Sequence, residues 1–200
     1  MTRVSVVIAY DGTGADRIRR GAYEKVLRHL LDLHKPIFVA CDTHQPYRLA
    51  YAVNRCVRNH PCDVFLLNYA DVIVPLKQVR QAIRLALDAP GQVFAFDEYH
   101  RVMEPDGDYE LPMEQVNANA CMAIQRECFL EVGGYDEKFV GWAMEDKEFN
   151  DRCGARWPAR RVPGRLEHLW HGERRGDDSA LETSAEQVAA NRAYYASLSG

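Results

Sequence analysis

The chain has 200 residues, of which 47% are hydrophobic, and it carries a formal net charge of −4 at pH 7. This length and apolar content suit one globular domain with one substantial core, and the negative charge argues against a broad polyanion-binding surface. No apolar run approaches the ~18 residues of a membrane-spanning helix, and the N-terminus lacks a signal-peptide pattern. Six scattered cysteines without a CxxC pair fit a reducing compartment, so we expect a cytoplasmic protein.

The first hundred residues alternate short apolar runs with amphipathic stretches. The β-branched run at 3–9 predicts a buried strand, and the apolar positions between 16 and 34 recur at helical spacing. The same alternation predicts strands at 36–42, 63–75 and 92–100 and helices at 47–60 and 76–87. This rhythm is typical of βαβ units, so we predict an α/β fold with a central, mostly parallel sheet flanked by helices.

The second half of the chain is less regular and predicts an irregular C-terminal lobe. Its pattern indicates a polar loop at 103–113, a strand at 116–124, a helix at 125–134 with a glycine C-cap, and a helix at 145–153. A last short strand or turn is expected at 166–171. The tail at 183–198 opens with Thr183-x-x-Glu186, a capping-box pattern that predicts a terminal helix.

Three acids follow predicted strands: Asp11, Asp42 and Asp71. In an open α/β sheet, ligands bind at the carboxyl edge of the strands, where these side chains would lie. Asp71 is the most informative, because it comes after a hydrophobic strand and before a second apolar run. A carboxylate placed there needs a partner, and a divalent cation is one natural partner. The alternative is an aspartate that caps a turn.

His168 and His171 lie three residues apart near the end of the folded pattern. Neutral imidazole is a good ligand for an ion such as Mn²⁺, so a late histidine could complete a site with a strand-end aspartate. The alternative is a structural histidine at a strand end.

The stretch 133–149, "GGYDEKFVGWAMEDKEF", places two adjacent acids three residues after a Gly-Trp pair. Glu145 and Asp146 are adjacent, so on a helix they point about 100° apart and cannot share one role. Both would be favoured electrostatically at a helix N-terminus, which is the structural alternative. Trp142, just before them, offers a platform on which a sugar can stack. A carboxylate beside such a platform is suited to act as a general base toward a hydroxyl.

With these residues in place, the sequence resembles glycosyltransferases of the GT-A fold. "VGGYDEKFVGWAMEDKEFNDR" is similar to their Gly-Gly-Phe-Asp-Glu … Gly-Trp-Gly-Gly-Glu-Asp-x-Glu-Phe segment. The nearest types are the β-1,4-galactosyltransferase C-terminal region and the chondroitin-polymerase branch of the large family 2. "YRLAYAVNRCVRNHPCDVFLLNYADVIVP" resembles the segment that leads to the D-x-D motif, and "HLWH" resembles a late histidine. The resemblance covers roughly residues 3–175.

The resemblance implies a single Rossmann-like GT-A domain over 1–200. It divides this domain into a nucleotide-sugar-binding half at 1–100, an acceptor and catalytic half at 101–178, and a C-terminal helix at 179–200. The implied activity is the inverting transfer of a sugar from a nucleotide-sugar, usually a UDP-sugar, to a hydroxyl of a carbohydrate, protein or other acceptor. Mn²⁺ or Mg²⁺ would bind the diphosphate of the donor.

The resemblance also implies a role for each matching residue. Asp146 is expected to be the catalytic base and Glu145 a ligand of the acceptor hydroxyl, with Trp142 as the acceptor platform. Asp71 and His171 are expected to bind the metal, with His168 as the other candidate histidine. The expected nucleotide-sugar-binding residues are Asp11, Asp42, Arg48, Asn54, Tyr69 and Asp71.

Two departures from the pattern bear on function. Tyr69 replaces the first aspartate of D-x-D, and Ala143-Met144 replaces Gly-Gly beside the acceptor site. One alternative function is therefore a nucleotide-sugar-binding module with weak or lost catalysis. Another is transfer to a nucleic-acid base, with phosphates bound by one of two arginine clusters: Arg17, Arg19 and Arg20, or Arg156, Arg160, Arg161 and Arg165.

Overall fold

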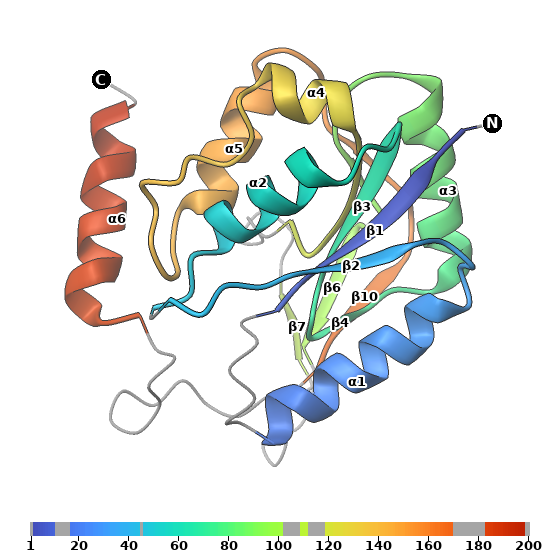
Figure 1. Ribbon diagram of the computed structural model, residues 1–200, viewed down its shortest axis with the longest axis horizontal. Helices are drawn as coiled ribbons and strands as arrows, with labels where there is room; N and C mark the ends of the chain where they lie inside the picture. The colour runs from blue at the N-terminus through green and yellow to red at the C-terminus, as the bar shows by residue number, and fades with distance from the viewer. Residues whose placement is uncertain are drawn as a thin grey trace.

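The computed structural model describes residues 2–10, 17–44, 46–101, 109–111, 119–169 and 183–198. These parts form an α/β body in which helices cover both sides of a central sheet (Figure 1). The predicted α/β class and the flanked central sheet are therefore confirmed.

The central sheet has six strands in the order β2-β1-β3-β8-β5-β9. Its strands are β1 (Val4–Ala9), β2 (Ile37–Ala40), β3 (Val64–Tyr69), β5 (Val93–Phe94), β8 (Cys121–Gln125) and β9 (Arg160–Arg161). All six residues of β1 are buried, because helices cover both faces of the sheet. β1 pairs in parallel with β2 and β3, whereas β8 runs antiparallel between β3 and β5. The sheet is thus mixed: β2, β1 and β3 are parallel, β8 is antiparallel to both of its neighbours, and β5 pairs in parallel with β9.

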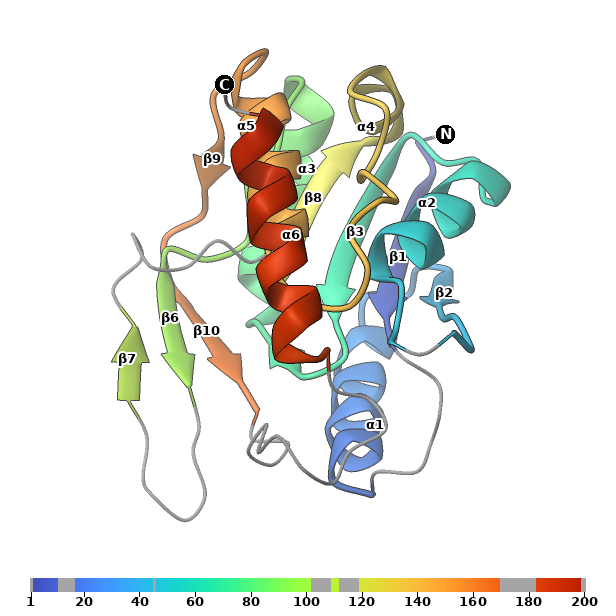
Figure 2. The same ribbon diagram turned by 90° about the vertical axis from the view of Figure 1, so that its left-hand side faces the viewer.

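Six helices surround this sheet in the described parts of the chain. They are α1 (Arg17–Leu31), α2 (Leu49–Asn59), α3 (Leu76–Asp88), α4 (Arg126–Glu131), α5 (Glu145–Gly154) and α6 (Ala185–Leu198). α2, α4 and α5 lie on one side of the strands, and α1 and α3 lie on the other (Figure 1). The C-terminal helix α6 stands beside α5, away from the sheet (Figure 2).

A second, smaller sheet has the order β4-β10-β6-β7. Its strands are β4 (Val72–Ile73), β6 (Glu98–Arg101), β7 (Tyr109–Leu111) and β10 (Arg165–His168). β10 inserts between β4, to which it is antiparallel, and β6, to which it is parallel. Figure 2 shows β10 beside β6. A strand from late in the chain, β10, therefore joins two strands that lie much earlier, β4 and β6.

Two strands expected to be continuous are each divided between the two sheets. The stretch 63–75 forms β3 and β4, and 92–100 forms β5 and β6. The first break is a turn at Ala70 and Asp71, which the Asn68 side chain holds by donating to the carbonyls of Tyr69 (2.8 Å) and Val72 (3.1 Å). Apolar runs on either side of such a turn look like one strand in the sequence.

The expected helix ends are found, with one correction. α4 is followed by Gly133 (φ 85°) and Gly134 (φ 72°), which confirms the glycine C-cap. The capping residue of α6 is Ser184, whose hydroxyl accepts from the Gln187 N–H at 3.1 Å. The prediction that Thr183 caps this helix was wrong, because its hydroxyl accepts the N–H of Trp142 instead, at 2.6 Å.

No helix in the described parts of the chain is long and apolar enough to cross a membrane.

Candidate active site

The carboxyl ends of β1, β2 and β3 lie at one edge of the central sheet, because the three strands are parallel. Asp42 lies two residues after β2, and Asp71 lies two residues after β3. Asp11, two residues after β1, is outside the described residues. The structure thus brings Asp42 and Asp71 to the edge where the sequence places a ligand site.

Asp42 and Arg48 form a two-point ion pair at this edge. Arg48 Nε lies 2.7 Å from Asp42 Oδ2, and Nη2 lies 3.2 Å from Oδ1. The hydrogen bond from Arg48 holds the pKa of the Asp42 carboxyl below its usual range, against the opposing effect of burial. The guanidinium of Arg48 also lies over the Tyr51 ring, 4.6 Å from its centroid. The pair therefore keeps a charged carboxylate and an aromatic face beside the end of β2.

Asp71 and His168 meet through the strands of the second sheet. His168 pairs with Val72, the residue after Asp71, and Leu169 N–H donates to the Asp71 carbonyl at 2.7 Å. The two side chains are 3.6 Å apart between His168 Nε2 and Asp71 Oδ2. The Tyr99 ring stacks on the imidazole with centroids 5.9 Å apart. The candidate histidine with a described position is thus His168, whereas His171 lies outside the described residues.

The Asp71–His168 pair fits a divalent metal ion. Two ligand atoms that each lie ~2.1 Å from one ion are at most ~4.2 Å apart, so the observed spacing allows both to bind it. A carboxylate oxygen and an imidazole nitrogen are both suitable ligands for Mn²⁺. No group of three or more such ligands occurs among the described residues, so further ligands would come from the substrate or from the remaining residues.

Asp146 lies in the first turn of α5 and is held by three hydrogen-bond donors. The Tyr69 hydroxyl, at the end of β3, is 2.6 Å from both carboxylate oxygens. The Tyr135 hydroxyl donates to Oδ1 at 3.2 Å, and the backbone N–H of Asn119 donates to Oδ2 at 3.1 Å. This half-buried carboxylate thus bridges α5 and the strand that leads to Asp71.

The turn before α5 directs Asp146 toward the sheet. Gly141 (φ 74°), Ala143 (φ 103°) and Met144 (φ 71°) all have left-handed backbone conformations, which are costly for residues other than glycine. Met144 is the N-cap and makes no side-chain capping bond. Acidic side chains in the first turn, Asp146 among them, favour the helix by offsetting the positive end of its dipole.

Burial raises the pKa of Asp146 to about 6, although hydrogen bonds from Tyr69, Asn119 and Tyr135 lower it. A general base works best when its pKa lies near the operating pH. A carboxyl group with this pKa is mostly ionised at pH 7.

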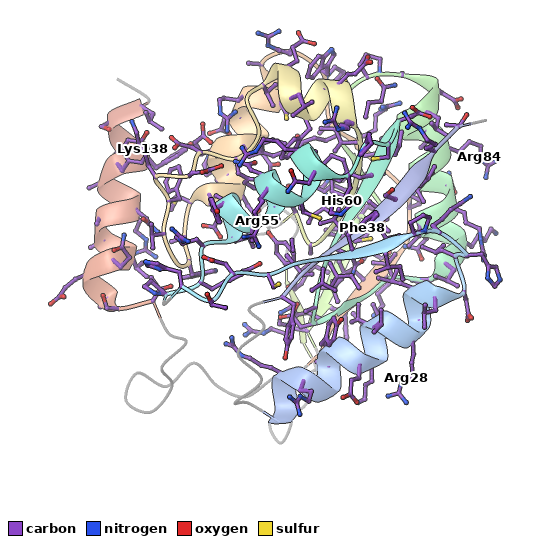
Figure 3. All side chains as sticks on the ribbon, in the orientation of Figure 1. Arg28, Phe38, Arg55, His60, Arg84 and Lys138 are labelled. Carbon is purple, nitrogen blue, oxygen red and sulfur yellow. The ribbon has the colours of Figure 1, made fainter. Side chains whose placement is uncertain are left out.

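Trp142 and Glu145 flank Asp146 in different ways. Trp142 is 50% exposed, whereas Glu145 is only 6% exposed. The backbone of Trp142 is fixed by α6: its N–H donates to Thr183, and its carbonyl accepts from the Asn191 amide at 3.0 Å. Nearby, the Lys138 ammonium lies over the Tyr194 ring, with the labelled Lys138 side chain next to α6 (Figure 3).

The predicted nucleotide ligand Asn54 lies beneath the site. It is 3% exposed, and its Oδ1 accepts the Tyr135 N–H at 2.9 Å. Its Nδ2 donates to the Tyr135 carbonyl at 2.8 Å and to Glu137 at 2.9 Å. This geometry favours a structural role, in which Asn54 supports Tyr135, over the expected contact with a nucleotide.

Two residues of the site were not singled out in the sequence, Asn119 and Tyr135. Asn119 is fully buried and donates through Nδ2 to the Tyr135 hydroxyl at 2.8 Å. A signal was present for Tyr135, because the resembling segment has phenylalanine where this chain has a residue with a hydroxyl group. Asn119 carried no signal of its own, since it lies in a stretch that reads as part of a strand.

One of the two candidate basic clusters is largely used inside the protein. Arg160 donates to the carbonyls of Leu85 and Ala89, both at 2.8 Å. Arg161 lies over the Phe94 ring, 4.5 Å from its centroid, and Arg156 pairs with Glu131. These contacts leave little of this cluster to bind phosphates.

The chain has the fold of GT-A glycosyltransferases, which agrees with the resemblance seen in the sequence. A sequence profile described as the N-terminal domain of galactosyltransferase matches residues 99–171. No curated protein sequence matches the chain.

Solved structures of glycosyltransferases resemble the chain over most of its length. A mutant Drosophila β1,4-galactosyltransferase 7, solved with manganese, UDP-Gal and xylobiose, is 15% identical over 80% of this chain, with a TM-score of 0.57. GalNAc-T7, solved with UDP, GalNAc and Mn²⁺, is 14% identical over 98%, with a TM-score of 0.64. A mannosyltransferase from Pyrobaculum calidifontis, in complex with GDP-Man and Mn²⁺, is 14% identical over 87%, with a TM-score of 0.56.

The chain spans 65%, 48% and 58% of the lengths of these three proteins, in the same order. At such low identity the comparisons establish the fold, and the reaction has to be argued from the site itself.

Proposed function

We propose that the chain is an inverting glycosyltransferase that moves a sugar from a UDP-sugar to an acceptor hydroxyl. The observation that carries this proposal is the hydrogen bond between Tyr69 and Asp146. It brings a carboxylate from the acceptor half to the end of β3, two residues before Asp71. Asp146, which can accept a proton, therefore lies at the strand edge where the nucleotide-sugar would bind.

Asp146 is the proposed general base. In the reaction, the acceptor oxygen forms a bond to the anomeric carbon as the bond from that carbon to the nucleotide diphosphate breaks. The acceptor proton passes to Asp146, and the diphosphate leaves with the bonding electron pair. Attack from the face opposite the leaving group inverts the anomeric centre in a single displacement.

The donor is proposed to bind along the ends of β1, β2 and β3. Asp42, kept charged by Arg48, would contact the nucleobase of the donor, and Asp11 is a further candidate ligand. Asp71 and His168 would hold Mn²⁺, with His171 as a further candidate ligand three residues on. A bound Mn²⁺ would neutralise negative charge on the leaving diphosphate. The manganese and UDP-Gal in one of the similar structures, and the Mn²⁺ and UDP in another, support this choice of donor and metal.

The acceptor is proposed to be a carbohydrate that stacks on Trp142. This residue is half exposed, and it lies three residues before Glu145, the first of the two acids of α5. Glu145 would accept a hydrogen bond from an acceptor hydroxyl. The Drosophila relative bound to xylobiose supports a sugar acceptor.

Donor and metal binding can be tested by thermal unfolding with UDP-sugars in Mn²⁺ and in EDTA. A ligand at 100 times its Kd should add about 2.7 kcal/mol to the free energy of unfolding. Asp71→Ala should remove the difference between Mn²⁺ and EDTA, whereas Asp88→Ala, an exposed change on α3, should keep it. Separate His168→Ala and His171→Ala variants identify the histidine ligand. Equal stabilisation in EDTA would rule out the proposed metal site.

The base can be tested by turnover of Asp146→Asn, which keeps the size of the side chain but cannot take up the proton. Donor binding should stay near normal while turnover falls by roughly 10²–10⁴-fold. Asp151→Asn is the matched control, because this exposed aspartate lies on the same helix and pairs with Lys147. Turnover of Asp146→Asn within threefold of the wild type would reject Asp146 as the base. It would then favour a nucleotide-sugar-binding module.

A further inference from the structure

We infer that Tyr69 is a positioning residue that orients the Asp146 carboxylate. While Tyr69, Tyr135 and Asn119 donate to this carboxylate, a remaining lone pair faces the incoming hydroxyl of the acceptor substrate. This inference rests on the proposed role of Asp146 as the base. It assigns Tyr69 a task different from that of the aspartate it replaces, which the resemblance places on the donor side.

Three hydrogen-bond donors occupy most of the lone-pair sites of the Asp146 carboxylate. An ionised carboxylate has two oxygens with about four lone-pair sites. The Tyr69 hydroxyl, the Tyr135 hydroxyl and the Asn119 N–H each contact it, at 2.6, 3.2 and 3.1 Å. Little accepting capacity remains, and its direction is set by these donors. A base held in this way meets the acceptor without first having to rotate.

The direction of these hydrogen bonds follows from the groups themselves. The Asn119 amide nitrogen can only donate, so the Tyr135 oxygen, 2.8 Å away, is the acceptor of that bond. The single proton of Tyr135 is then available for Asp146. The backbone N–H of Asn119 is likewise only a donor. Each partner thus presents a proton to the carboxylate, which favours its ionised form.

Tyr69 is the rigid member of the group. It is the last residue of β3, pairs with Ala9 of β1, and donates its N–H to the Ala120 carbonyl at 2.9 Å. Its own carbonyl accepts from the Asn68 side chain at 2.8 Å. Asp146, by contrast, follows a turn with left-handed residues at Ala143 and Met144. The strand therefore fixes the tyrosine, and the tyrosine fixes the aspartate.

Tyr69 has a measurable effect on the pKa of Asp146. The titratable groups around Asp146 are the two tyrosines and the neighbouring Glu145, which acts on both of them. Burial raises the pKa of Asp146 to about 6, and among the groups that lower it the hydrogen bond from Tyr69 has the largest effect. Removal of that donor should therefore raise the pKa further, whereas a purely steric role would leave it unchanged.

The experiment measures the pKa of Asp146 directly in wild type and in Tyr69→Phe. Carboxyl ¹³C NMR of aspartate-labelled protein follows the titration, and the signal absent from Asp146→Asn identifies the residue. The pKa should rise by about one unit, because a hydrogen bond to a charged group is worth about that much. The acid limb of the kcat/KM profile should move to higher pH by a similar amount. Tyr195→Phe removes a hydroxyl bonded to Asp151 at the surface and should change neither quantity.

A second variant keeps the test decisive if Tyr69→Phe does not fold. Tyr135→Phe removes the longer of the two hydroxyl contacts and should raise the same pKa by a smaller amount. An unchanged Asp146 pKa in whichever of these variants folds would overturn the inference and leave the proposed base intact. Full turnover by Asp146→Asn would instead overturn the proposed base. The two failures are distinguishable because the NMR titration needs no activity.

Discussion

Two opposing effects act on the pKa of Asp146. Burial favours the neutral acid, and the hydrogen bonds from Tyr69, Asn119 and Tyr135 favour the carboxylate, with a resulting pKa of about 6. Because this value lies above that of the unfolded chain, the folded protein binds more protons than the unfolded one between about pH 4 and pH 6. The contribution of this group to stability is therefore full at low pH and is lost as the pH rises through 6.

We predict that Asp146→Asn makes the protein more stable relative to wild type as the pH rises. Asparagine has no charge to bury, so the variant should gain on the wild type between pH 4 and pH 7. Urea unfolding at pH 4.5 and pH 7.5 measures the effect, with Asp151→Asn as the exposed control. A stability difference that is the same at both pH values would contradict the assigned pKa.

Glu145, the neighbouring acid, gives a prediction of a different kind. Glu145→Gln keeps the shape of the side chain but weakens a hydrogen bond to an acceptor hydroxyl, because a charged acceptor binds more strongly than a neutral one. The KM for the acceptor should rise several-fold, while the KM for the donor stays near that of the wild type. Steady-state kinetics with each substrate varied in turn separates the two, and a change confined to the donor KM would rule out this role.

At the level of single residues, the sequence could predict those candidates whose surroundings are local. Asp42 and Asp71 follow strands, and Asp146 starts a helix, so their positions can be inferred from short patterns. Asn119 and Tyr135 could not be found in this way. Their roles depend on a contact between a strand end and a turn, and no periodicity reports such a contact.

Among the elements, the segment before α5 is held from two sides. Gly141 N–H donates to the Tyr47 carbonyl at 3.2 Å, and the Asn191 amide donates to the carbonyls of Val140 and Trp142 at 3.0 Å. Asn191 is 2% exposed, although it lies on the outermost helix. α6 therefore fixes the backbone of the proposed acceptor platform.

We predict that Asn191→Ala loosens this platform. The two carbonyls would lose their donor in a buried place, which should lower the free energy of unfolding by about 1–3 kcal/mol. The acceptor KM should rise, because Trp142 is no longer held in one position. Chemical denaturation and acceptor kinetics measure the two effects, with the exposed Arg192→Ala on the same helix as the control. An unchanged acceptor KM in a folded variant would show that α6 does not serve the acceptor.

The two glycines after α4 offer a matched pair of substitutions. Both have left-handed backbones, but a Cβ on Gly134 would lie 2.5 Å from Asn54 Oδ1, whereas one on Gly133 meets nothing within 4 Å. Gly133→Ala should cost about 1 kcal/mol through its backbone alone. Gly134→Ala should cost more, since it also displaces the amide that supports Tyr135. Urea unfolding compares them, and equal losses would mean that Asn54 moves aside freely.

Element types were easier to predict from the sequence than element partners. The helices and most strands lie close to the expected ranges, because hydrophobic periodicity marks them. The division of 63–75 and 92–100 between two sheets was missed, since the first turn is flanked by apolar residues and the apolar run at 93–96 continues past the end of β5. β9 was also missed, because a two-residue strand that reads Arg-Arg carries no apolar signal.

For the whole molecule, the charge distribution argues against a nucleic-acid substrate. The net charge is −4, and Arg160 and Arg161 are used in internal contacts. We predict no saturable binding to a DNA or RNA duplex at physiological salt, where nonspecific binders show Kd values of about 10⁻⁴–10⁻⁶ M. Fluorescence anisotropy across a salt series tests this. Binding with a steep salt dependence would instead favour the alternative function, sugar transfer to a nucleic-acid base.

The insertion of β10 between β4 and β6 also bears on the order of folding. Asp71 emerges early during synthesis, but His168 reaches it only after β10 has entered the second sheet. Closing so long a stretch of chain is slow, since its entropy is lost before the new contacts form. The first half of the chain should therefore collapse around β1 and β3 without a complete metal pair. A nascent protein would complete the proposed metal-binding pair only after β10 has been synthesised and has paired with β4 and β6.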